Sequence, residues 1–177
     1  FISIIFLIFM VFLAFFGPSL ISESFTKMNL RLRNLEPFSF DHHFMYFFGA
    51  DALGRSMIAR LVVATQNTMF IAGTAVILSM TLGGVLGLIS GYYGGRIGNL
   101  IMRMADIIMS FPSLLLAVIV LYMFDPGLLN LVIVLAFTRL PIYMRTARAE
   151  VLEIRERLFV SAAISMGASN SRIIFKH

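Results

Sequence analysis

The sequence predicts an all-α fold, a polytopic bundle of membrane-spanning helices. Of the 177 residues, 59% are apolar, only 13% carry a charge, and the mean hydropathy is +0.93. Soluble domains carry about 25% charged residues, because their surfaces need solvating groups. One uncharged stretch runs from Leu61 to Gly95, whereas a membrane-spanning helix needs only roughly 20 apolar residues. The chain is therefore expected to be an integral, multi-pass membrane protein.

The charge pattern excludes a nucleic-acid-binding protein. The net charge is +5, but the 14 cations lie between hydrophobic runs instead of gathering on one polar face. Cations in that position usually set the orientation of membrane helices. The absence of cysteine excludes a disulfide scaffold, and the high apolar content excludes a disordered chain.

Residues 1–17 are predicted to form the first transmembrane helix, ending at Gly17 and Pro18. The alternative is the tail of a signal peptide, which would lead into a soluble domain. More membrane segments follow instead, so we interpret this segment as a retained helix. The chain begins at Phe1 and not at Met, and we interpret it as a piece of a longer membrane protein.

Residues 18–64 are the one long polar connection. Near its end, Asp51 is expected to cap a short helix. Five apolar residues share one face of that helix, which is expected to lie on the membrane surface: Leu53, Met57, Ile58, Leu61 and Val62.

Residues 65–149 are predicted to form a core of three transmembrane helices. The spans are expected at 65–90, 104–124 and 128–149. Pro112 lies inside the middle span, and a tight turn at Asp125-Pro126-Gly127 separates the last two.

Glycines recur every four residues at the end of the first of these spans. Small residues at that spacing let membrane helices approach closely, so Gly83 and Gly87 are predicted to pack against another helix. Gly91 and Gly95 continue the spacing, but they also fit the loop that would follow the span, GYYGGRIGN. We expect the later glycines to form the turn.

The short loops predict the orientation, because cytoplasmic loops are rich in Lys and Arg. The turn at Asp125 has no cation and is expected outside. From Arg145 onward there are six cations against three acids, so residues 150–177 are expected in the cytoplasm and residues 18–64 outside.

No pattern typical of an enzyme occurs. A Walker A loop needs Gly-Lys-Ser/Thr, but neither Lys27 nor Lys176 follows a glycine, and no G-x-S-x-G elbow is present. His42-His43 lacks the helical i, i+4 spacing and a third ligand typical of metal sites, so a role on the loop surface is favoured. We expect no catalytic residue, no bound cofactor and no metal.

A helix–turn–helix is predicted near the end of the chain, in FVSAAISMGASNSRIIFKH from Phe159 onward. Ala162 and Ala163 give a smooth helical face, and Gly167 supplies the break between the helices. Such a hairpin suits docking into a groove on a partner, and an ordinary interfacial helix is the alternative.

This segment resembles the E-A-A-x-x-x-G loop of the permease subunits of binding-protein-dependent ABC importers. From residue 48 to the end, the chain is similar to the dipeptide/oligopeptide/nickel branch of that family, and most similar to its second permease type. The residues that carry the resemblance are Gly49-Ala50-Asp51, Leu53-Gly54-Arg55, Gly91-Tyr92-Tyr93-Gly94-Gly95, Arg103, Asp106, Phe111-Pro112, Arg145, Arg148-Ala149-Glu150-Val151-Leu152, Ala162-Ala163, Gly167-Ala168-Ser169, Arg172-Ile173 and His177.

The resemblance implies a bundle of six spans, of which about four would lie in this chain, in the bacterial cytoplasmic (inner) membrane. It implies a second homologous permease, two cytoplasmic ATPase subunits that bind the ATP, and an external solute-binding protein. It also implies that the E-A-A loop docks into the ATPase. On that analogy the coupling residues are Ser161, Ala162, Ala163, Gly167, Ala168, Ser169 and Arg172.

The sequence departs from the family pattern at two positions. Ser161 stands where the family has Glu, which puts a charge contact to the ATPase in doubt, and Ala50 replaces the usual Thr. The resemblance leaves the solute open among dipeptides, oligopeptides and nickel. A secondary transporter is an alternative function, although it would need more acids deep in the spans, and a non-transporting membrane scaffold is another.

Two charges are expected inside the spans. Asp106 lies three residues after Arg103, so the two are predicted to pair on one helix face. Arg139 lies near the middle of the last span, where an Arg costs at least about 2.5–3.5 kcal/mol and is expected to face the bundle or a wet cavity. Two hypotheses for Arg139 stay open: it lines the translocation path and meets a peptide carboxylate, or it pairs with an acid elsewhere in the assembly.

Overall fold

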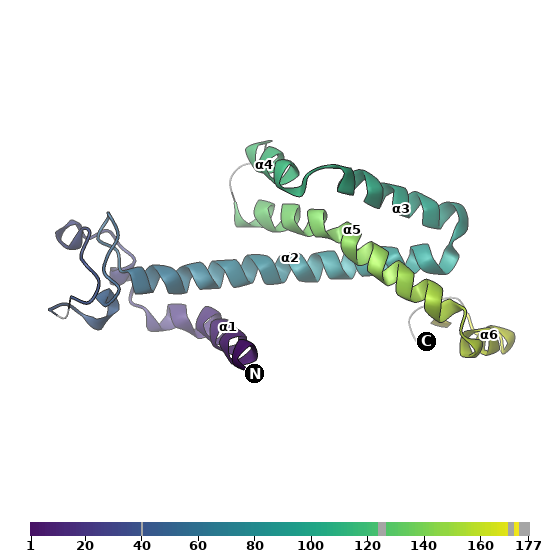
Figure 1. Ribbon diagram of the computed structural model, residues 1–177, viewed down its shortest axis with the longest axis horizontal. Helices are drawn as coiled ribbons and strands as arrows, with labels where there is room; N and C mark the ends of the chain where they lie inside the picture. Colours follow the sequence, from purple (N-terminus) through teal and green to yellow (C-terminus); the bar gives the residue numbers. More distant parts are fainter. Residues whose placement is uncertain (40, 124–126, 170–171, 174–177) are drawn as a thin grey trace. The chain divides into compact units, whose positions relative to one another are not determined.

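The computed structural model describes residues 1–39, 41–123, 127–169 and 172–173. Throughout these ranges the regular structure is helical, and the one β-type contact is an isolated bridge between Ala50 and Ser56. The prediction of an all-α fold is confirmed (Figure 1). The chain divides into two compact units, residues 1–71 and 72–177, which are described separately.

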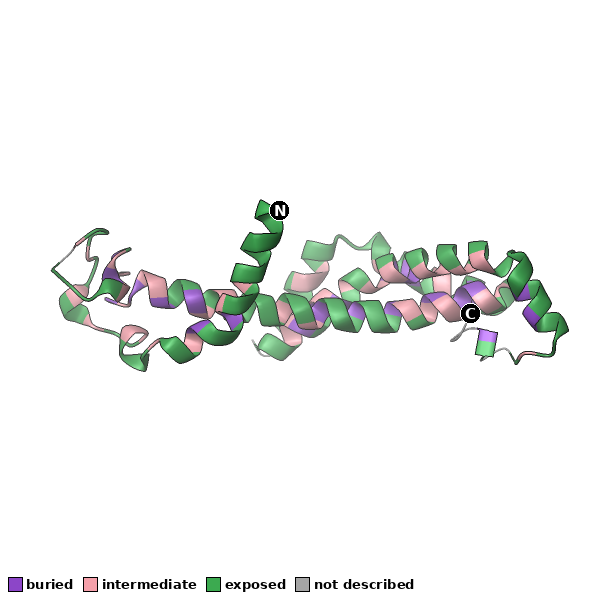
Figure 2. Ribbon diagram, turned by 90° about the horizontal axis from the view of Figure 1, so that it is seen from below, coloured by how far each residue is buried: buried purple, intermediate pink, exposed green. Residues whose placement is uncertain are grey.

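In the first unit, α1 (Ile2–Leu20) is the apolar N-terminal helix. It continues past Gly17 and includes Pro18 in its last turn, so it ends three residues later than the sequence predicted. Gly17 is buried because it lies against α2: a Cβ at Gly17 would lie 2.5 Å from Cγ1 of Val62. Most of the other side chains of α1 are exposed, as expected for a lipid-facing helix (Figure 2).

The polar connection after α1 is held together by short 3-10 helices and backbone hydrogen bonds. The three 3-10 helices are η1 (Glu23–Phe25), η2 (Leu30–Leu32) and η3 (Phe44–Tyr46). Ser56 closes the connection: its backbone N–H donates to the carbonyl of Phe25, and its hydroxyl donates to the carbonyl of Met45. The same hydroxyl accepts from the N–H of Ala59 and so caps the next helix.

The next helix, α2, spans Met57–Tyr93 without interruption. The separate interfacial helix expected from the sequence is instead the first turns of α2, which Ser56 caps and Asp51 does not. The helix also continues through Gly91, which therefore lies in the helix and not in the predicted loop. It ends at Tyr93, and the next residue, Gly94, has a positive φ of +58°, which glycine adopts readily.

The predicted middle span is broken. It forms α3 (Gly95–Ser110) and α4 (Ser113–Met123), which are bent by 84° at the break between them. Pro112 disfavours helical geometry at the residue before it, and Phe111 is extended, with φ −92° and ψ 136°. The sequence analysis placed Pro112 inside one continuous helix and missed this bend.

The last two helices are α5 (Leu128–Arg155) and α6 (Leu158–Ser165). Among the described residues, three helices are long and apolar enough to cross a membrane, α1, α2 and α5, and the bent pair α3 and α4 brings the number to four if it is one span. The predicted turn at Asp125-Pro126 and the last four residues lie outside the described residues.

Candidate functional site

The predicted coupling loop consists of α6 and the turn that follows it. At this turn Gly167 has a φ of +80°, and its N–H donates to the carbonyl of Ile164 at 2.9 Å. The N–H of Ala168 donates to the carbonyl of Ala163 at 3.0 Å. This pair of bonds is a Schellman motif, which ends a helix and satisfies its last carbonyls. The break predicted at Gly167 therefore has a defined hydrogen-bonded geometry.

Five of the seven predicted coupling residues line one open hollow of about 440 Å³: Ala162, Ala163, Gly167, Ala168 and Arg172. Phe159 and Met166 complete its lining. Ala162 is exposed and Ala163 is buried, so the two alanines present different faces of α6. Ser161 and Ser169 are exposed and do not line the hollow. Most of the second arm of the predicted hairpin lies outside the described residues.

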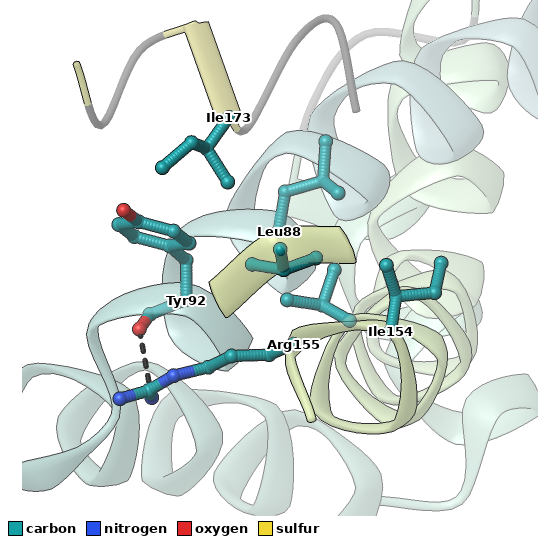
Figure 3. A pocket seen from close by; sticks show the side chains of 7 residues that line it. Leu88, Tyr92, Ile154, Arg155 and Ile173 are labelled. Atoms are coloured by element: carbon teal, nitrogen blue, oxygen red, sulfur yellow. Dashed lines mark hydrogen bonds between the residues drawn. The ribbon is translucent and has the colours of Figure 1, made fainter. Parts of the chain in front are cut away.

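A second, apolar cavity of about 140 Å³ lies beneath the coupling loop (Figure 3). Its walls come from α2, α5 and α6 together with Ile173, and the lining residues are Leu88, Tyr92, Val151, Ile154, Arg155, Val160 and Ile173. Val160 is 2% exposed and Ile173 is 5% exposed. The loop is thus joined to the ends of α2 and α5 both before and after its turn.

The small residues of α2 lie directly against α5. A Cβ at Gly83 would lie 2.7 Å from the carbonyl oxygen of Leu140, and one at Gly87 would lie 2.6 Å from that of Met144. Gly91 belongs to the same contact, because a Cβ there would lie 2.8 Å from Cβ of Val151. The buried stripe on α2 extends one turn at a time back through Ser79 to Ala75. The four-residue spacing of this stripe is visible in the sequence. Whether Gly91 packs against a helix or forms the turn was decided only by the structure, which shows that it packs against α5.

Asp106 pairs with a different arginine from the one predicted. Its Oδ1 accepts from Nη2 of Arg145 at 2.6 Å, so the ion pair joins α3 to α5 instead of linking Asp106 to Arg103 along one helix. Both side chains are more than half exposed. The distance of 39 residues along the chain is why sequence spacing did not reveal the pair.

Arg139 borders a cavity of about 270 Å³ beside the break between α3 and α4. Thr138 and Ser113 contribute hydroxyl-bearing residues to the same lining, and Ile108, Met109, Phe111, Leu116 and Ile142 complete it. Pro141, which has no N–H to donate, lies two residues further along α5. The broken helix and the arginine therefore meet at one cavity.

Asp51 is the centre of the polar connection between α1 and α2, which we call the outer connection because the sequence predicts that it lies outside the membrane. Its Oδ1 accepts from the N–H groups of Leu53 and Arg55, both at 2.9 Å, and its Oδ2 pairs with the guanidinium groups of Arg55 at 2.8 Å and Arg60 at 2.9 Å. The hydrogen bond from the Arg55 backbone is the largest influence on Asp51, and desolvation, the second largest, opposes it. With the further hydrogen bonds from the Arg55 side chain and the Leu53 backbone, the pKa of Asp51 falls from 3.8 to about 2. The sequence identified Asp51 only as a helix cap and as part of a family motif.

The described residues bring no group of three or more His, Asp or Glu side chains together at metal-binding distances. His43 has a local role, because its Nδ1 accepts from the N–H of Met45 at the start of η3 and its ring lies 4.8 Å from that of Phe25.

The described helices define an all-α membrane-spanning protein, and comparisons with known proteins specify its family. Residues 83–177, more than half of the chain, match the family described as binding-protein-dependent transport system inner membrane component. The chain belongs to this family. The resemblance stated from the sequence is confirmed, and the chain is part of a multi-pass protein of the inner membrane.

Several curated permeases are similar to most of this chain. The dipeptide transport system permease protein DppC of Alkalihalophilus pseudofirmus is 38% identical over 167 residues, which are 94% of this chain and 53% of that protein. The oligopeptide transport system permease protein OppC of Bacillus subtilis is 32% identical over 99% of this chain and 56% of its own length. The di/tripeptide transport system permease protein DppC of Pseudomonas aeruginosa is 39% identical over 73% of this chain and 43% of its length. The chain therefore spans about half the length of the curated relatives it matches.

Proposed function

We propose that this chain is part of a permease subunit of an ABC importer, which moves peptides or a related small solute inward using ATP hydrolysed by partner subunits. The observation that carries the proposal is the hydrogen-bonded turn after α6, at the predicted coupling loop of a chain of this family. The names of the matched relatives, which are permeases for dipeptides, oligopeptides and di/tripeptides, support a peptide as the solute.

The coupling loop is the part proposed to contact the ATPase. Its Schellman turn fixes the direction of the chain, and the exposed face of α6 with the adjoining hollow offers a concave, mostly apolar surface. Arg172 lines the same hollow, and its guanidinium group is proposed to pair with an acidic group on the ATPase. A rigid helical element of this kind transmits a rigid-body movement better than a flexible segment does.

The proposed assembly contains a second homologous permease, two cytoplasmic ATPase subunits and an external solute-binding protein, with lipid around the bundle. The ATP is proposed to bind to the ATPase subunits, so this chain would contribute no catalytic residue and hold no cofactor. The positive-inside bias supports a position in the cytoplasm for the coupling loop and a position outside for the connection around Asp51.

Arg139 is proposed to line the translocation path. Its position supports this role, because irregular backbone and charges at membrane depth are tolerated where they border a cavity, and Arg139 shares its cavity with the break at Pro112. A guanidinium there suits the carboxylate of a peptide. Pairing with an acid elsewhere in the assembly is the competing role.

The coupling proposal is tested by purifying the complete transporter with the substitution Ala162→Phe. Ala162 is exposed, so the new ring would occupy the docking face without disturbing the packing of α6. We expect the permease to reach the membrane at its normal level but to lose the ATPase subunit on co-purification. The matched control is Ala52→Phe at an exposed alanine of the outer connection, which should retain it. ATPase binding that survives Ala162→Phe would contradict the proposed docking face.

A further inference from the structure

Two arginines of α5 reach across to the turn between α2 and α3. Nη1 of Arg148 donates to the carbonyl of Gly98 at 3.2 Å, and Nη1 of Arg155 donates to the carbonyl of Tyr92 at 3.0 Å (Figure 3 shows the second bond). The arginines are seven residues apart, about two helical turns, so they project from the same side of α5. Their two acceptors lie on either side of Gly94, where the chain turns from α2 into α3.

We propose that Arg148 and Arg155 act as a clamp that makes the coupling loop, the end of α5 and the turn between α2 and α3 move as one body. This inference rests on the proposed function of the loop and names the residues that would pass its movement into the bundle. Both arginines are positioning residues in this role, because they act on the backbone of the transporter and not on the solute.

The acceptors of the clamp are suited to hold a cation. Tyr92 belongs to the last turn of α2, where the carbonyl groups carry the negative end of the helix dipole. The carbonyl of Gly98 accepts a second hydrogen bond from the hydroxyl of Ser90 at 3.1 Å, and Ser90 is completely buried. The turn is therefore fixed from α2 and from α5 at the same carbonyl.

Close packing of the helix backbones brings the arginines within reach. Gly91 lies against Val151, midway between Arg148 and Arg155, and a Cβ at Gly91 would lie 2.8 Å from the Cβ of that valine. A Cβ at Gly98 would in turn lie 2.6 Å from the carbonyl oxygen of Ser90. Close backbone packing of this kind holds helices together, whereas directional hydrogen bonds to backbone carbonyls also fix how far one helix slides along the other.

The coupling loop rests on this clamped region. Val160 of α6 and Ile173 after the turn both line the apolar cavity whose other walls include Tyr92, Val151 and Arg155 (Figure 3). Because both residues are buried against the same helix ends, a pull on the loop acts on α2 and α5 together. The hydrogen bonds of the two arginines then carry that displacement across to α3.

The proposal is tested by measuring the distance between two spin labels in the complete transporter. Cysteines in the rest of the transporter are first replaced. This chain has no cysteine, so a spin label can be placed on each side of the clamp with the exposed substitutions Arg96→Cys in α3 and Ser165→Cys in α6. With the clamp intact we expect a narrow distance distribution that stays the same in the nucleotide-free and ATP-trapped states. With Arg148→Gln and Arg155→Gln added, we expect the distribution to broaden and to shift on ATP trapping.

Transport provides the second readout. We expect the solute taken up per ATP hydrolysed to fall by about ten-fold when both arginines become Gln, because two charge-assisted hydrogen bonds are lost. The matched control is Arg157→Gln, which removes an exposed cation that pairs with Glu153 and should leave both the distance and the uptake per ATP unchanged. When Arg155→Lys replaces Arg155→Gln in the double variant, part of the lost uptake per ATP should return, because lysine keeps a cationic donor at this position.

A label distance that changes on ATP trapping while the clamp is intact would overturn the proposal, as would unchanged uptake per ATP in the double variant. Failure of the proposed function is a separate result: the unaltered permease would then not co-purify with an ATPase subunit. In that case the width of the nucleotide-free distribution still tests the clamp. If the double variant does not assemble, each single variant is measured in the same way.

Discussion

Single side chains organise the outer connection, and Asp51 does so most extensively. One carboxylate oxygen accepts two backbone N–H groups and the other faces the guanidinium groups of Arg55 and Arg60. These bonds favour the charged carboxylate, which is why the pKa of Asp51 falls to about 2. The charge of Asp51 is thus part of what shapes the segment that leads into α2.

The low pKa of Asp51 predicts how the outer connection responds to acid. The folded-state pKa of Asp51 lies below the ordinary value of 3.8. The charged carboxylate therefore stabilises the folded connection fully above about pH 4, and this stabilisation is lost as the pH falls toward 2. Hydrogen exchange at the amides of Leu53 and Arg55, corrected for intrinsic rates, should show protection that persists down to about pH 4 and then declines toward pH 2.

The Asp51→Asn variant is the control for that titration. It should show weaker protection at neutral pH and no decline between pH 4 and 2, because the amide has no proton to gain. Protection in the unaltered chain that is already lost near pH 5 would contradict the assigned pKa.

At the scale of helices, the contact between α2 and α5 depends on the absence of side chains. The stripe of small residues lets carbonyl groups of α5 approach the backbone of α2, so a single methyl group has no room there. Gly84, three residues before Gly87, offers a control on the same helix, because a Cβ there would lie more than 4 Å from any heavy atom outside its own stretch of α2.

Gly87→Ala is therefore expected to destabilise the protein by about 1–3 kcal/mol, because the added Cβ forces α2 and α5 apart. Gly84→Ala should be neutral or stabilising by up to about 1 kcal/mol, since alanine favours helix over glycine. Thermal unfolding of the purified permease in detergent measures both. Equal melting temperatures for the two variants would show that the close approach at Gly87 has no energetic consequence.

At the scale of the whole molecule, the membrane-spanning helices have to shield the charged side chain of Arg139 from lipid, because a charge in the bilayer is costly. Arg139 is exposed in this chain and borders the cavity beside the broken span, where Ser113 and Thr138 supply hydroxyl groups. The two roles open to Arg139 differ in what the assembly loses when the charge is removed.

Arg139→Gln in the complete transporter separates those roles. If Arg139 lines the path, uptake of the solute should fall by about ten-fold while all subunits still co-purify, because one charged hydrogen bond to the solute is lost. Co-purification that fails together with uptake would instead assign Arg139 to an ion pair within the assembly. Uptake that is unchanged would contradict the path role.

Composition and hydropathy alone determined that this is an all-α membrane protein with apolar spans, because a bilayer imposes one length and one polarity on every helix that crosses it. The series of motifs from Gly49-Ala50-Asp51 to Arg172-Ile173, taken together, likewise indicated the family from sequence, and the family match confirms it. Tertiary structure decided what local spacing could not: Asp106 pairs with Arg145 and not with Arg103, and Arg148 and Arg155 reach carbonyls more than 45 residues away. The physical reason is that hydropathy reports each segment's own environment, whereas a partner on another helix is selected by how closely the two backbones approach.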